Sequence, residues 1–323
     1  MSKNATSNDA TPMMMAMSQS EFGDPSVLKL TKMQRPTPDI SQILIKVQVA
    51  GVNPTDWKHR SAERFLGEPP YVLGWDVAGV VESVGLGVTI FKPGDVVMGM
   101  LLYPKGVGSH AEYVVGPARA FVKKPERVDI IQAGALPLAA LTAWQSLVDT
   151  AQVEAGDRVL IHAAAGGVGH LAVQIAKSLG AYVIGTASAQ KHELVKSLGA
   201  DEMVDYQNVD FVEVVGHVDV VLDTIGDEYQ LRSLRTLSKD GTLVSTVPRA
   251  AEGLFEEAKN RNVRAELILV EADQQGMRNV AQLAERGELR AIIAGEYALA
   301  EAAKAHEAGE TNRTTGKMVL VME

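Results

Sequence analysis

The segment from residue 159 to residue 179 constrains the fold more than any other part of the chain. Residues 159–163 form an apolar run suited to a buried strand, and after a break of small residues the apolar positions recur at helical spacing. The pattern predicts a strand, a glycine turn and a helix. In such a turn, Gly166 allows the chain to bend, Gly167 leaves room for a pyrophosphate, and Gly169 lets the helix approach the strand. The start of that helix is therefore predicted to bind an anionic dinucleotide.

A second strand over residues 181–188 completes a βαβ unit of about 30 residues, which favours a nicotinamide cofactor over a purely structural turn. NAD-specific folds place an Asp or Glu at the end of this strand to bind the ribose 2′-hydroxyl. Here the strand ends in Thr186, Ala187 and Ser188, and the next charged residue is Lys191. A hydroxyl and an ammonium suit a 2′-phosphate, so the sequence favours NADPH over NADH. The alternative is that Lys191 only begins the exposed face of the next helix.

The charge balance and the lack of cysteine exclude several classes of function. The 323 residues include 31 basic and 40 acidic ones, and the net charge of −9 gives no electrostatic footprint for nucleic acid or an anionic membrane. A hydrophobic content of 46% suits a soluble protein with one large or two ordinary domains. Without cysteine the chain can form no disulfide, thiolate zinc site or iron–sulfur cluster. We expect a cytoplasmic protein that acts on a small molecule.

The first part of the chain has the pattern of an irregular β domain. Residues 1–12 are mostly polar and are expected to form a disordered tail, with no secretory signal or membrane segment. Residues 13–17 are expected to form the first strand. Short apolar runs broken by glycine and proline then predict mostly antiparallel strands at 43–49, 77–84, 96–100 and 111–115.

From residue 141 to about residue 286, strands alternate with helices at βαβ spacing, which predicts an open parallel sheet. Its strands are expected at 159–163, 181–186, 202–205, 218–222, 242–247 and 266–270. A final strand at 317–321 is expected to return to the first part of the chain. The predicted division is a β domain of residues 13–138 and 288–323, and a dinucleotide-binding domain of residues 139–287.

Several short motifs lie in order along the chain. They are 50–58 (AGVNPTDWK), 74–81 (GWDVAGVV), 92–97 (KPGDVV), 140–144 (ALTAW), the glycine turn, 198–201 (LGAD) and 316–320 (GKMVL). With these motifs the chain resembles the medium-chain dehydrogenase/reductase superfamily over residues 13–323, and more closely its zinc-free quinone oxidoreductase branch. The resemblance implies an α/β fold, in which a GroES-like, mostly antiparallel β domain is joined to a Rossmann domain with a doubly wound parallel sheet.

The choice of branch depends on missing metal ligands. Zinc-dependent members of the superfamily hold their catalytic metal with a cysteine, a histidine and an acid. In this chain Asn53 stands near the position of the first ligand, and Trp75 and Asp76 replace the usual His-Glu pair. The seven histidines include no i, i+4 pair that could chelate a metal, so each is interpreted as a surface or satisfied structural residue. We therefore expect no metal site, which disfavours a zinc-type alcohol dehydrogenase.

Without a metal, hydride transfer is easiest to an acceptor that is already polarised, such as a quinone or a C=C bond conjugated to a carbonyl. The resemblance places Asn53 and Lys58 in a loop at the domain cleft, where the amide would orient groups and the ammonium would stabilise the oxyanion. Tyr103 is a candidate proton donor on a segment that could line the cleft. Each has a structural alternative: Lys58 in a solvated basic stretch, Asn53 as a turn former, Tyr103 as a core or rim residue. Asp56 could simply cap the following helix.

The resemblance also assigns residues to the cofactor. Thr142 would lie near the nicotinamide carboxamide, Lys191 and Tyr206 near the 2′-phosphate, and Arg313 would reach the cofactor from the C-terminal segment. Tyr206 has the alternative of ordinary packing. Residues that end or follow three later strands would contact ribose and nicotinamide. The predicted cofactor residues are Thr142, Gly166, Gly167, Val168, Gly169, Ser188, Lys191, Tyr206, Ile225, Val247, Leu269 and Arg313.

The sequence thus predicts an NADPH-dependent, zinc-independent reductase that transfers hydride to quinones or α,β-unsaturated carbonyl compounds. The alternative is an NADPH-binding protein of the same fold with little catalysis, recruited for a structural or adaptor role. No nucleic-acid or membrane partner is expected. The apolar run 267–270 lies at the expected sheet edge and could pair with its own copy across a two-fold axis, so a homodimer is the expected assembly.

Overall fold

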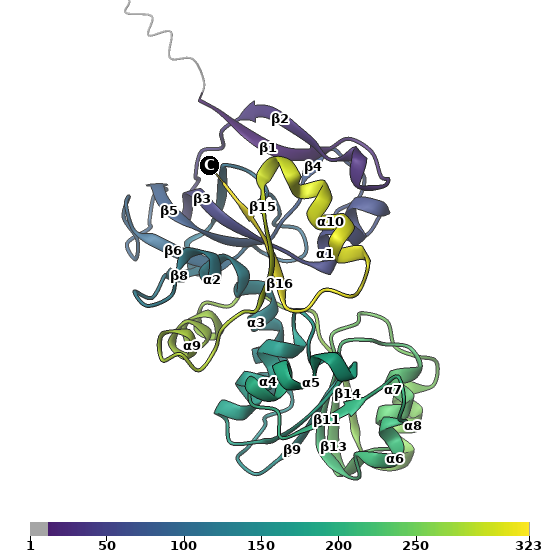
Figure 1. Ribbon diagram of the computed structural model, residues 1–323. Helices are drawn as coiled ribbons and strands as arrows, with labels where there is room; N and C mark the ends of the chain where they lie inside the picture. The colour runs from purple at the N-terminus through teal and green to yellow at the C-terminus, as the bar shows by residue number, and fades with distance from the viewer. Residues whose placement is uncertain (1–11, 323) are drawn as a thin grey trace, which may run out of the picture.

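The computed structural model describes residues 12–322 and shows two bodies of secondary structure, one above the other in Figure 1. The middle of the chain, in teal and green, forms the lower body. The N-terminal part, in purple and blue, and the C-terminal part, in yellow, together form the upper one. Residues 1–11 of the predicted tail lie outside the described residues.

Six strands form a fully parallel sheet in the lower body, in the order β11-β10-β9-β12-β13-β14. They are β9 (Arg158–Ile161), β10 (Tyr182–Ala187), β11 (Glu202–Asp205), β12 (Val218–Asp223), β13 (Leu237–Ser245) and β14 (Arg264–Leu267). The chain winds outward from β9 to β11, then crosses back to β12 and winds the other way. The doubly wound sheet predicted from the sequence is confirmed. The order reverses between β9 and β12, which is where such sheets bind ligands.

The helices of the lower body cover this sheet because each has an apolar face that needs a partner. α4 (Gly169–Ser178), which follows the glycine turn, buries Leu171, Ile175 and Ala176 completely. The other helices of the lower body are α5 (His192–Ser197), α6 (Phe211–Val214), α7 (Glu228–Ser233) and α8 (Leu254–Arg261). α2 (Ile130–Ala135) packs on the upper body, and α9 (Gln274–Glu285) packs against the upper body and α3 (Pro137–Trp144), which continues into a π-helical turn (Gln145–Thr150). α3 lies between the two bodies, because it contacts α4 below and β5 and β6 of the upper sheet.

The upper body is built on a mixed sheet in the order β15-β16-β3-β5-β6-β8, with β7 paired to β3. Its strands are β3 (Gln42–Val52), β5 (Asp76–Val84), β6 (Val96–Met100), β7 (Tyr113–Pro117), β8 (Phe121–Lys123), β15 (Ile293–Ala298) and β16 (Lys317–Val321). All pairs are antiparallel except β15 with β16. The last strand returns to the first part of the chain as predicted, because Leu320 pairs with Ala50.

A small antiparallel sheet and two helices complete the upper body. The sheet has the order β2-β1-β4 and consists of β1 (Met13–Gln19), β2 (Lys29–Gln34) and β4 (Tyr71–Val72). The helices α1 (Pro54–Ser61) and α10 (Ala302–Glu310) contact each other. Short 3-10 turns lie at Pro25–Val27, Ala118–Ala120, Ala189–Lys191 and Leu299–Glu301.

The left-handed residue of the glycine turn is not a glycine. The left-handed conformation in this turn belongs to Ala163, with a φ of 47°, and Gly166 is not left-handed. Gly166 still closes the turn, because its N–H donates to the Ala163 carbonyl oxygen at 2.8 Å and a Cβ would lie 3.1 Å from that oxygen. The reason given for Gly169 is confirmed, because a Cβ at this position would collide with the carbonyl oxygen of Ala163 and with Ala164 Cα.

Candidate active site

Three backbone N–H groups at the start of α4 indicate an anion site. Within residues 12–322, the N–H groups of Gly167, Val168 and Gly169 have no acceptor, whereas the next one, from His170, bonds the Gly166 carbonyl oxygen at 3.1 Å. The first N–H groups of a helix have no partner inside it and carry the positive end of its dipole. Residues 166–168 are also partly accessible to solvent. This donor set fits the pyrophosphate of a dinucleotide.

The C-terminal segment crosses this turn. The Gly316 N–H donates to the Ala165 carbonyl oxygen at 3.0 Å, and a Cβ on Gly167 would have Lys317 and Gly316 as its nearest neighbours. Gly316 is required here, because its φ is 80° and a side chain would strike the carbonyl oxygen of Ile292. Lys317, the first residue of β16, is thereby brought to the glycine turn.

Lys317 is buried and its ammonium is surrounded by polar groups. It contacts the side-chain oxygen of Asn53, the Val52 carbonyl oxygen at 3.3 Å and the Asp76 carboxylate at 3.5 Å. The Asn53 amide nitrogen donates to the same carboxylate at 2.8 Å. Lys317, Asn53 and Asp76 are exposed by 2%, 2% and 0%. A buried ion pair repays its desolvation only when further hydrogen bonds satisfy it, as here. We call these three residues the buried polar triad.

The buried polar triad is joined to α3. The second carboxylate oxygen of Asp76 accepts from the Leu138 N–H at 2.5 Å, at the start of that helix. Burial raises the pKa of Asp76, while the Lys317 ammonium and the Asn53 amide lower it. One turn further along α3, the Thr142 hydroxyl donates to the Leu138 carbonyl oxygen at 2.7 Å. The lone pairs of Thr142 therefore stay available to accept from an amide such as a nicotinamide carboxamide.

Asp56 takes the helix-capping position that the sequence left as an alternative, and Asn53 is its partner in the cap. Asn53 precedes α1, and its backbone N–H donates to the Asp56 carboxylate at 2.7 Å. Burial raises the pKa of Asp56 to about 8. The Asn53 side chain is engaged by Lys317 and Asp76, so it orients protein groups.

Tyr103 joins a polar chain on α1. Its hydroxyl lies 3.1 Å from the Thr55 hydroxyl, which in turn lies 3.1 Å from His59 Nδ1. Its ring packs edge-on against Trp75, with 5.2 Å between ring centroids, and against Phe65 at 6.5 Å. Tyr103 is half-buried, so it is a rim residue whose hydroxyl belongs to a hydrogen-bonded network.

Lys58 lies one turn after Thr55 on α1 and is exposed. Partial desolvation and the Arg64 guanidinium lower its pKa. In the part of the chain that the structure describes, no ion pair or side-chain hydrogen bond engages its ammonium. The catalytic role of Lys58 stays a prediction.

The residues predicted for the 2′-phosphate gather at the carboxyl ends of β10 and β11. The Lys191 ammonium donates to the Arg313 carbonyl oxygen at 3.0 Å, so the C-terminal segment meets the end of β10 there. Ser188 precedes the turn that carries Lys191. Tyr206 directly follows β11 and is 49% exposed, which excludes the alternative of ordinary interior packing.

One acid lies in the same region. Asp205 is the last residue of β11 and pairs with Ala187 of β10. Its carboxylate accepts from the Asn208 amide at 2.6 Å and from the Gln207 N–H at 3.2 Å. These bonds hold the pKa of Asp205 below its usual range, so it stays ionised. The sequence reasoning did not consider this acid, because it lies on the neighbouring strand.

The apolar residues predicted for the cofactor lie beyond the carboxyl ends of three strands. Ile225 follows β12 and Val247 follows β13, while Leu269 lies two residues after β14. Ile225 and Leu269 are 41% and 43% exposed, so both side chains are accessible to a ligand. Asp223 holds this loop by accepting from the Ile225 N–H at 2.9 Å.

The histidines are more buried than predicted. Five lie in the interior: His59, His110, His162, His170 and His306. Both ring nitrogens of His162 and His170 are bonded, but one ring nitrogen of each of the other three has no partner in the described chain. The expectation of surface or satisfied histidines was wrong for these three. No group of three His, Asp or Glu side chains within residues 12–322 is placed to hold a metal ion.

The sequence reasoning missed Lys317, Thr55 and His59 as site residues. A usable signal existed for Lys317, because it stands at the head of the apolar run 318–321 and a charge in a buried strand needs a partner. Asp76 begins another apolar strand and carries the opposite charge. No pattern signalled Thr55 or His59.

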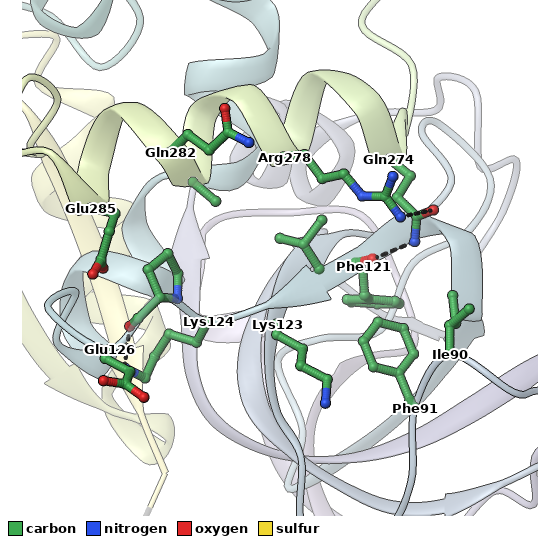
Figure 2. Close-up of a pocket in the computed structure, with 13 residues that line it drawn as sticks. Ile90, Phe91, Phe121, Lys123, Lys124, Glu126, Gln274, Arg278, Gln282 and Glu285 are labelled. Carbon is green, nitrogen blue, oxygen red and sulfur yellow. Dashed lines mark hydrogen bonds between the residues drawn. The ribbon is translucent and has the colours of Figure 1, made fainter.

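A separate cavity of about 490 Å³ lies between β8 and α9 (Figure 2). Phe91, Phe121 and Ile90 form its apolar wall, and Gln274 of α9 donates to the Phe121 carbonyl oxygen at 2.8 Å. None of its lining residues belongs to the glycine turn, the buried polar triad or the Tyr103 network. It therefore lies apart from the candidate active site.

Two family models match the chain. The alcohol dehydrogenase GroES-like domain matches residues 39–126, and the zinc-binding dehydrogenase model matches residues 198–320. No helix among the described residues is long and apolar enough to cross a membrane.

Proteins of similar sequence and structure extend over nearly the whole chain. A quinone oxidoreductase from Pongo abelii is 33% identical and covers 96% of this chain and 98% of its own. A chloroplastic NADPH-dependent alkenal/one oxidoreductase from Arabidopsis thaliana is 34% identical over 98% of this chain and 82% of its own. The structure of a quinone oxidoreductase from Coxiella burnetii superimposes with a TM-score of 0.91 at 37% identity, covering 97% of this chain and all of its own. The chain therefore belongs to the quinone oxidoreductase branch of the medium-chain dehydrogenase/reductase superfamily, with its GroES-like and Rossmann folds.

Proposed function

We propose that the protein is an NADPH-dependent, zinc-independent reductase that transfers hydride to quinones or α,β-unsaturated carbonyl compounds. The observation that carries the proposal is the approach of Lys317 to Gly167, which brings the buried polar triad to the three N–H groups at the start of α4. The N–H groups suit a pyrophosphate, and the triad and α1 border the region where an acceptor would meet the nicotinamide. The names of the similar proteins support both acceptor classes.

The cofactor residues divide into three sets. Gly167, Val168 and Gly169 bind the pyrophosphate through their N–H groups, with Gly166 beside them, and Thr142 accepts from the carboxamide. Ile225, Val247 and Leu269 contact the ribose and the nicotinamide. Ser188, Lys191, Tyr206 and Arg313 bind the 2′-phosphate. When bound, the cofactor supplies the hydride.

The preference for NADPH depends on which charges face the 2′-phosphate. The Lys191 ammonium meets the Arg313 backbone near the end of β10, and we assign the Arg313 guanidinium to the same place, whereas Asp205 supplies one anion on the neighbouring strand. Because the Asp205 carboxylate already accepts from Asn208 and Gln207, we assign it to holding its own turn. The positive charges of Lys191 and Arg313 then favour the 2′-phosphate of NADPH.

Zinc independence rests on the chemistry of the buried polar triad. Asn53 and Asp76 lie near the positions at which zinc-dependent relatives are expected to hold their metal, but here the Lys317 ammonium contacts both side chains. A buried ammonium repels a second cation, and neither a thiolate nor a histidine completes the set. The residues present do not fit a catalytic zinc ion.

In this proposal Asn53 is a positioning residue that holds Lys317 and Asp76. Lys58 supplies positive potential from the next turn of α1 and stabilises negative charge on the acceptor oxygen. We also propose that the protein is cytoplasmic, that its domains divide at residues 138/139 and 287/288, and that it forms a homodimer. The dimer would pair the free edge of β14, the last strand of the parallel sheet, with its copy.

The test follows the loss of NADPH absorbance when the purified protein meets 1,4-naphthoquinone or, separately, trans-2-hexenal. The proposal expects turnover with at least one acceptor, a lower rate with NADH, and no loss of activity after dialysis against EDTA. NADPH binding without turnover would instead support a recruited binding protein. Activity that EDTA abolishes and zinc restores would contradict zinc independence.

A further inference from the structure

The tautomer of His59 is fixed by its surroundings. Its Nδ1 lies 2.8 Å from the Thr55 carbonyl oxygen, and a carbonyl oxygen can only accept, so Nδ1 carries the hydrogen. The ring is 1% exposed, and its Nε2 has no partner in the described chain. Burial lowers the pKa of His59, so the ring is neutral and Nε2 is bare.

This tautomer decides which way the Thr55 hydroxyl points. The same Nδ1–H also faces the Thr55 hydroxyl oxygen at 3.1 Å, so that oxygen accepts at this contact. The Thr55 hydroxyl hydrogen then needs an acceptor, and within residues 12–322 the only one in reach is the Tyr103 hydroxyl oxygen at 3.1 Å. Donation from Thr55 to Tyr103 is the direction that gives this hydrogen a partner within the protein.

Tyr103 consequently keeps its own hydrogen for another acceptor. Its hydroxyl makes no hydrogen bond other than the one with Thr55 in the described chain. Burial raises the pKa of Tyr103, so the phenol stays protonated at neutral pH. Edge-on packing against the fully buried Trp75 holds the ring, and Phe65, which is 45% exposed, forms the outer wall beside it.

The hydroxyl of Tyr103 lies against the face of α1 that carries Thr55 and, one turn further on, Lys58. Its partner, Thr55, lies in the first turn of α1, two residues after Asn53. Asn53 contacts Lys317, and Lys317 is the nearest side chain to Gly167 of the glycine turn. A short path of contacts thus joins the Tyr103 hydroxyl to the predicted pyrophosphate site.

We propose that Tyr103 donates a hydrogen bond to the carbonyl oxygen of the acceptor, and that Thr55 and His59 are positioning residues that keep its hydrogen available. This role rests on the function proposed above and identifies the group that meets the developing charge. The flat, partly exposed ring of Phe65 beside it favours an acceptor with a flat conjugated ring over a small alkenal.

With an unsaturated carbonyl compound, hydride transfer places charge on the oxygen that Tyr103 faces. Hydride addition forms a C–H bond at the β-carbon, while the electron pair of the C=C bond shifts and leaves negative charge on the carbonyl oxygen; NADPH becomes NADP⁺. Tyr103 donates a hydrogen bond to that oxygen and keeps its proton. A proton from water then adds at the α-carbon.

The first experiment measures kcat and KM of Tyr103→Phe with 1,4-naphthoquinone. The variant keeps the ring, and loss of one oxyanion donor is expected to lower kcat about 100-fold or more with little change in KM. Thr55→Val is expected to lower kcat about tenfold, since one hydrogen bond is lost, and Thr55→Ser is expected to restore it. The matched control is Tyr182→Phe, because the Tyr182 hydroxyl donates to the Glu202 carboxylate at 2.6 Å and does not belong to the Tyr103 network. It should keep the wild-type kcat.

The second experiment does not require turnover. p-Nitrophenol, whose phenolate is yellow and resembles the developing oxyanion, is titrated into the protein in the presence of NADP⁺. The wild type is expected to bind the phenolate and lower its pKa, and Tyr103→Phe is expected to lose this shift.

The outcomes separate the two proposals. Equal kcat and equal phenolate binding in the wild type and Tyr103→Phe would overturn the role of Tyr103, whether or not the protein is a reductase. Phenolate binding that depends on Tyr103 in a protein that turns over no acceptor would overturn the reductase and leave the donor in place. A loss in Thr55→Val that Thr55→Ser does not restore would remove Thr55 and His59 as positioning residues.

Discussion

The ammonium of Lys317 lies against the side-chain oxygen of Asn53, although 264 residues separate the two in the sequence. One residue begins the last strand of the chain and the other precedes its first helix. Their contact lies beside the glycine turn. Residues from the first third, the middle and the end of the chain therefore form one site. Each prediction below tests one part of this arrangement.

Replacement of Lys317 by Met is expected to destabilise the protein by about 3–5 kcal/mol, because it leaves the buried Asp76 carboxylate without its cation. Adding Asp76→Asn removes the unpaired charge and should recover part of the loss. Urea unfolding of both variants measures this. Lys304→Met, which breaks the exposed Lys304–Glu301 pair, is the control and should leave stability unchanged. If Lys317→Met lost no more stability than the control, the ion pair between Lys317 and Asp76 would not stabilise the fold.

Two alanine variants of the glycine turn are expected to differ sharply. Gly169→Ala places a Cβ against the backbone of Ala163 and Ala164, which should cost about 1–3 kcal/mol of stability. Gly167→Ala meets no atom closer than Lys317 Cδ at 3.5 Å and should fold with nearly wild-type stability. Thermal unfolding of the two variants provides the comparison. Equal destabilisation of the two variants would mean that close packing of α4 does not explain the need for glycine at position 169.

The preference for NADPH is expected to depend on Lys191 and Arg313. Changing either residue to Gln should weaken NADPH binding about tenfold, because one charge-assisted contact with the 2′-phosphate is lost, and NADH binding should not change. Lys196→Gln, on the exposed face of α5, is the matched control. Dissociation constants for both cofactors test the prediction. An equal loss for NADPH and NADH would show that these residues do not contact the 2′-phosphate.

The stability of the protein is expected to fall as pH rises from 6.5 to 8 because of Asp56. Burial raises its pKa from 3.8 to about 8, so between these values the folded state holds a proton that the unfolded state releases. The proton on Asp56 contributes its full stabilisation below pH 3.8. Above this pH the free energy of unfolding decreases by at most about 1.4 kcal/mol per pH unit, and the contribution is lost above about pH 8. Burial lowers the pKa of His110 from 6.5 to about 4, so buried histidines of this kind change the stability only below pH 6.5.

The measurement compares urea unfolding of the wild type and Asp56→Asn at several pH values. Asn keeps an oxygen that can accept from the Asn53 N–H but does not titrate, so the difference between the two proteins isolates Asp56. The wild type should lose stability relative to the variant as pH rises. Parallel curves would contradict a protonated Asp56.

The sequence predicted the inner strands of the parallel sheet well because β9, β10 and β12 are almost wholly buried and carry apolar runs. β11 and β16 were predicted with their observed bounds, and β10 and β12 within one residue. β2 was missed because it is almost wholly exposed and shows no apolar alternation. β15 was missed because Gly295 and Glu296 interrupt its apolar residues.

The site was predictable only where one segment carries it. The glycine turn is contiguous, so its position followed from spacing alone, although the left-handed residue proved to be Ala163. The buried polar triad joins β16, β5 and the start of α1, and no local pattern states which distant charges meet. The bonds among Tyr103, Thr55 and His59 likewise depend on rotamers and on a tautomer, which only the assembled fold specifies.

The most direct test of the central claim is calorimetric titration of the protein with NADPH and with NADH, followed by addition of 1,4-naphthoquinone to the NADPH complex. We predict one binding site per chain, tighter binding of NADPH than of NADH, and oxidation of the bound NADPH by the quinone without added metal. No heat with NADPH, or a stable complex that the quinone does not oxidise, would contradict the account.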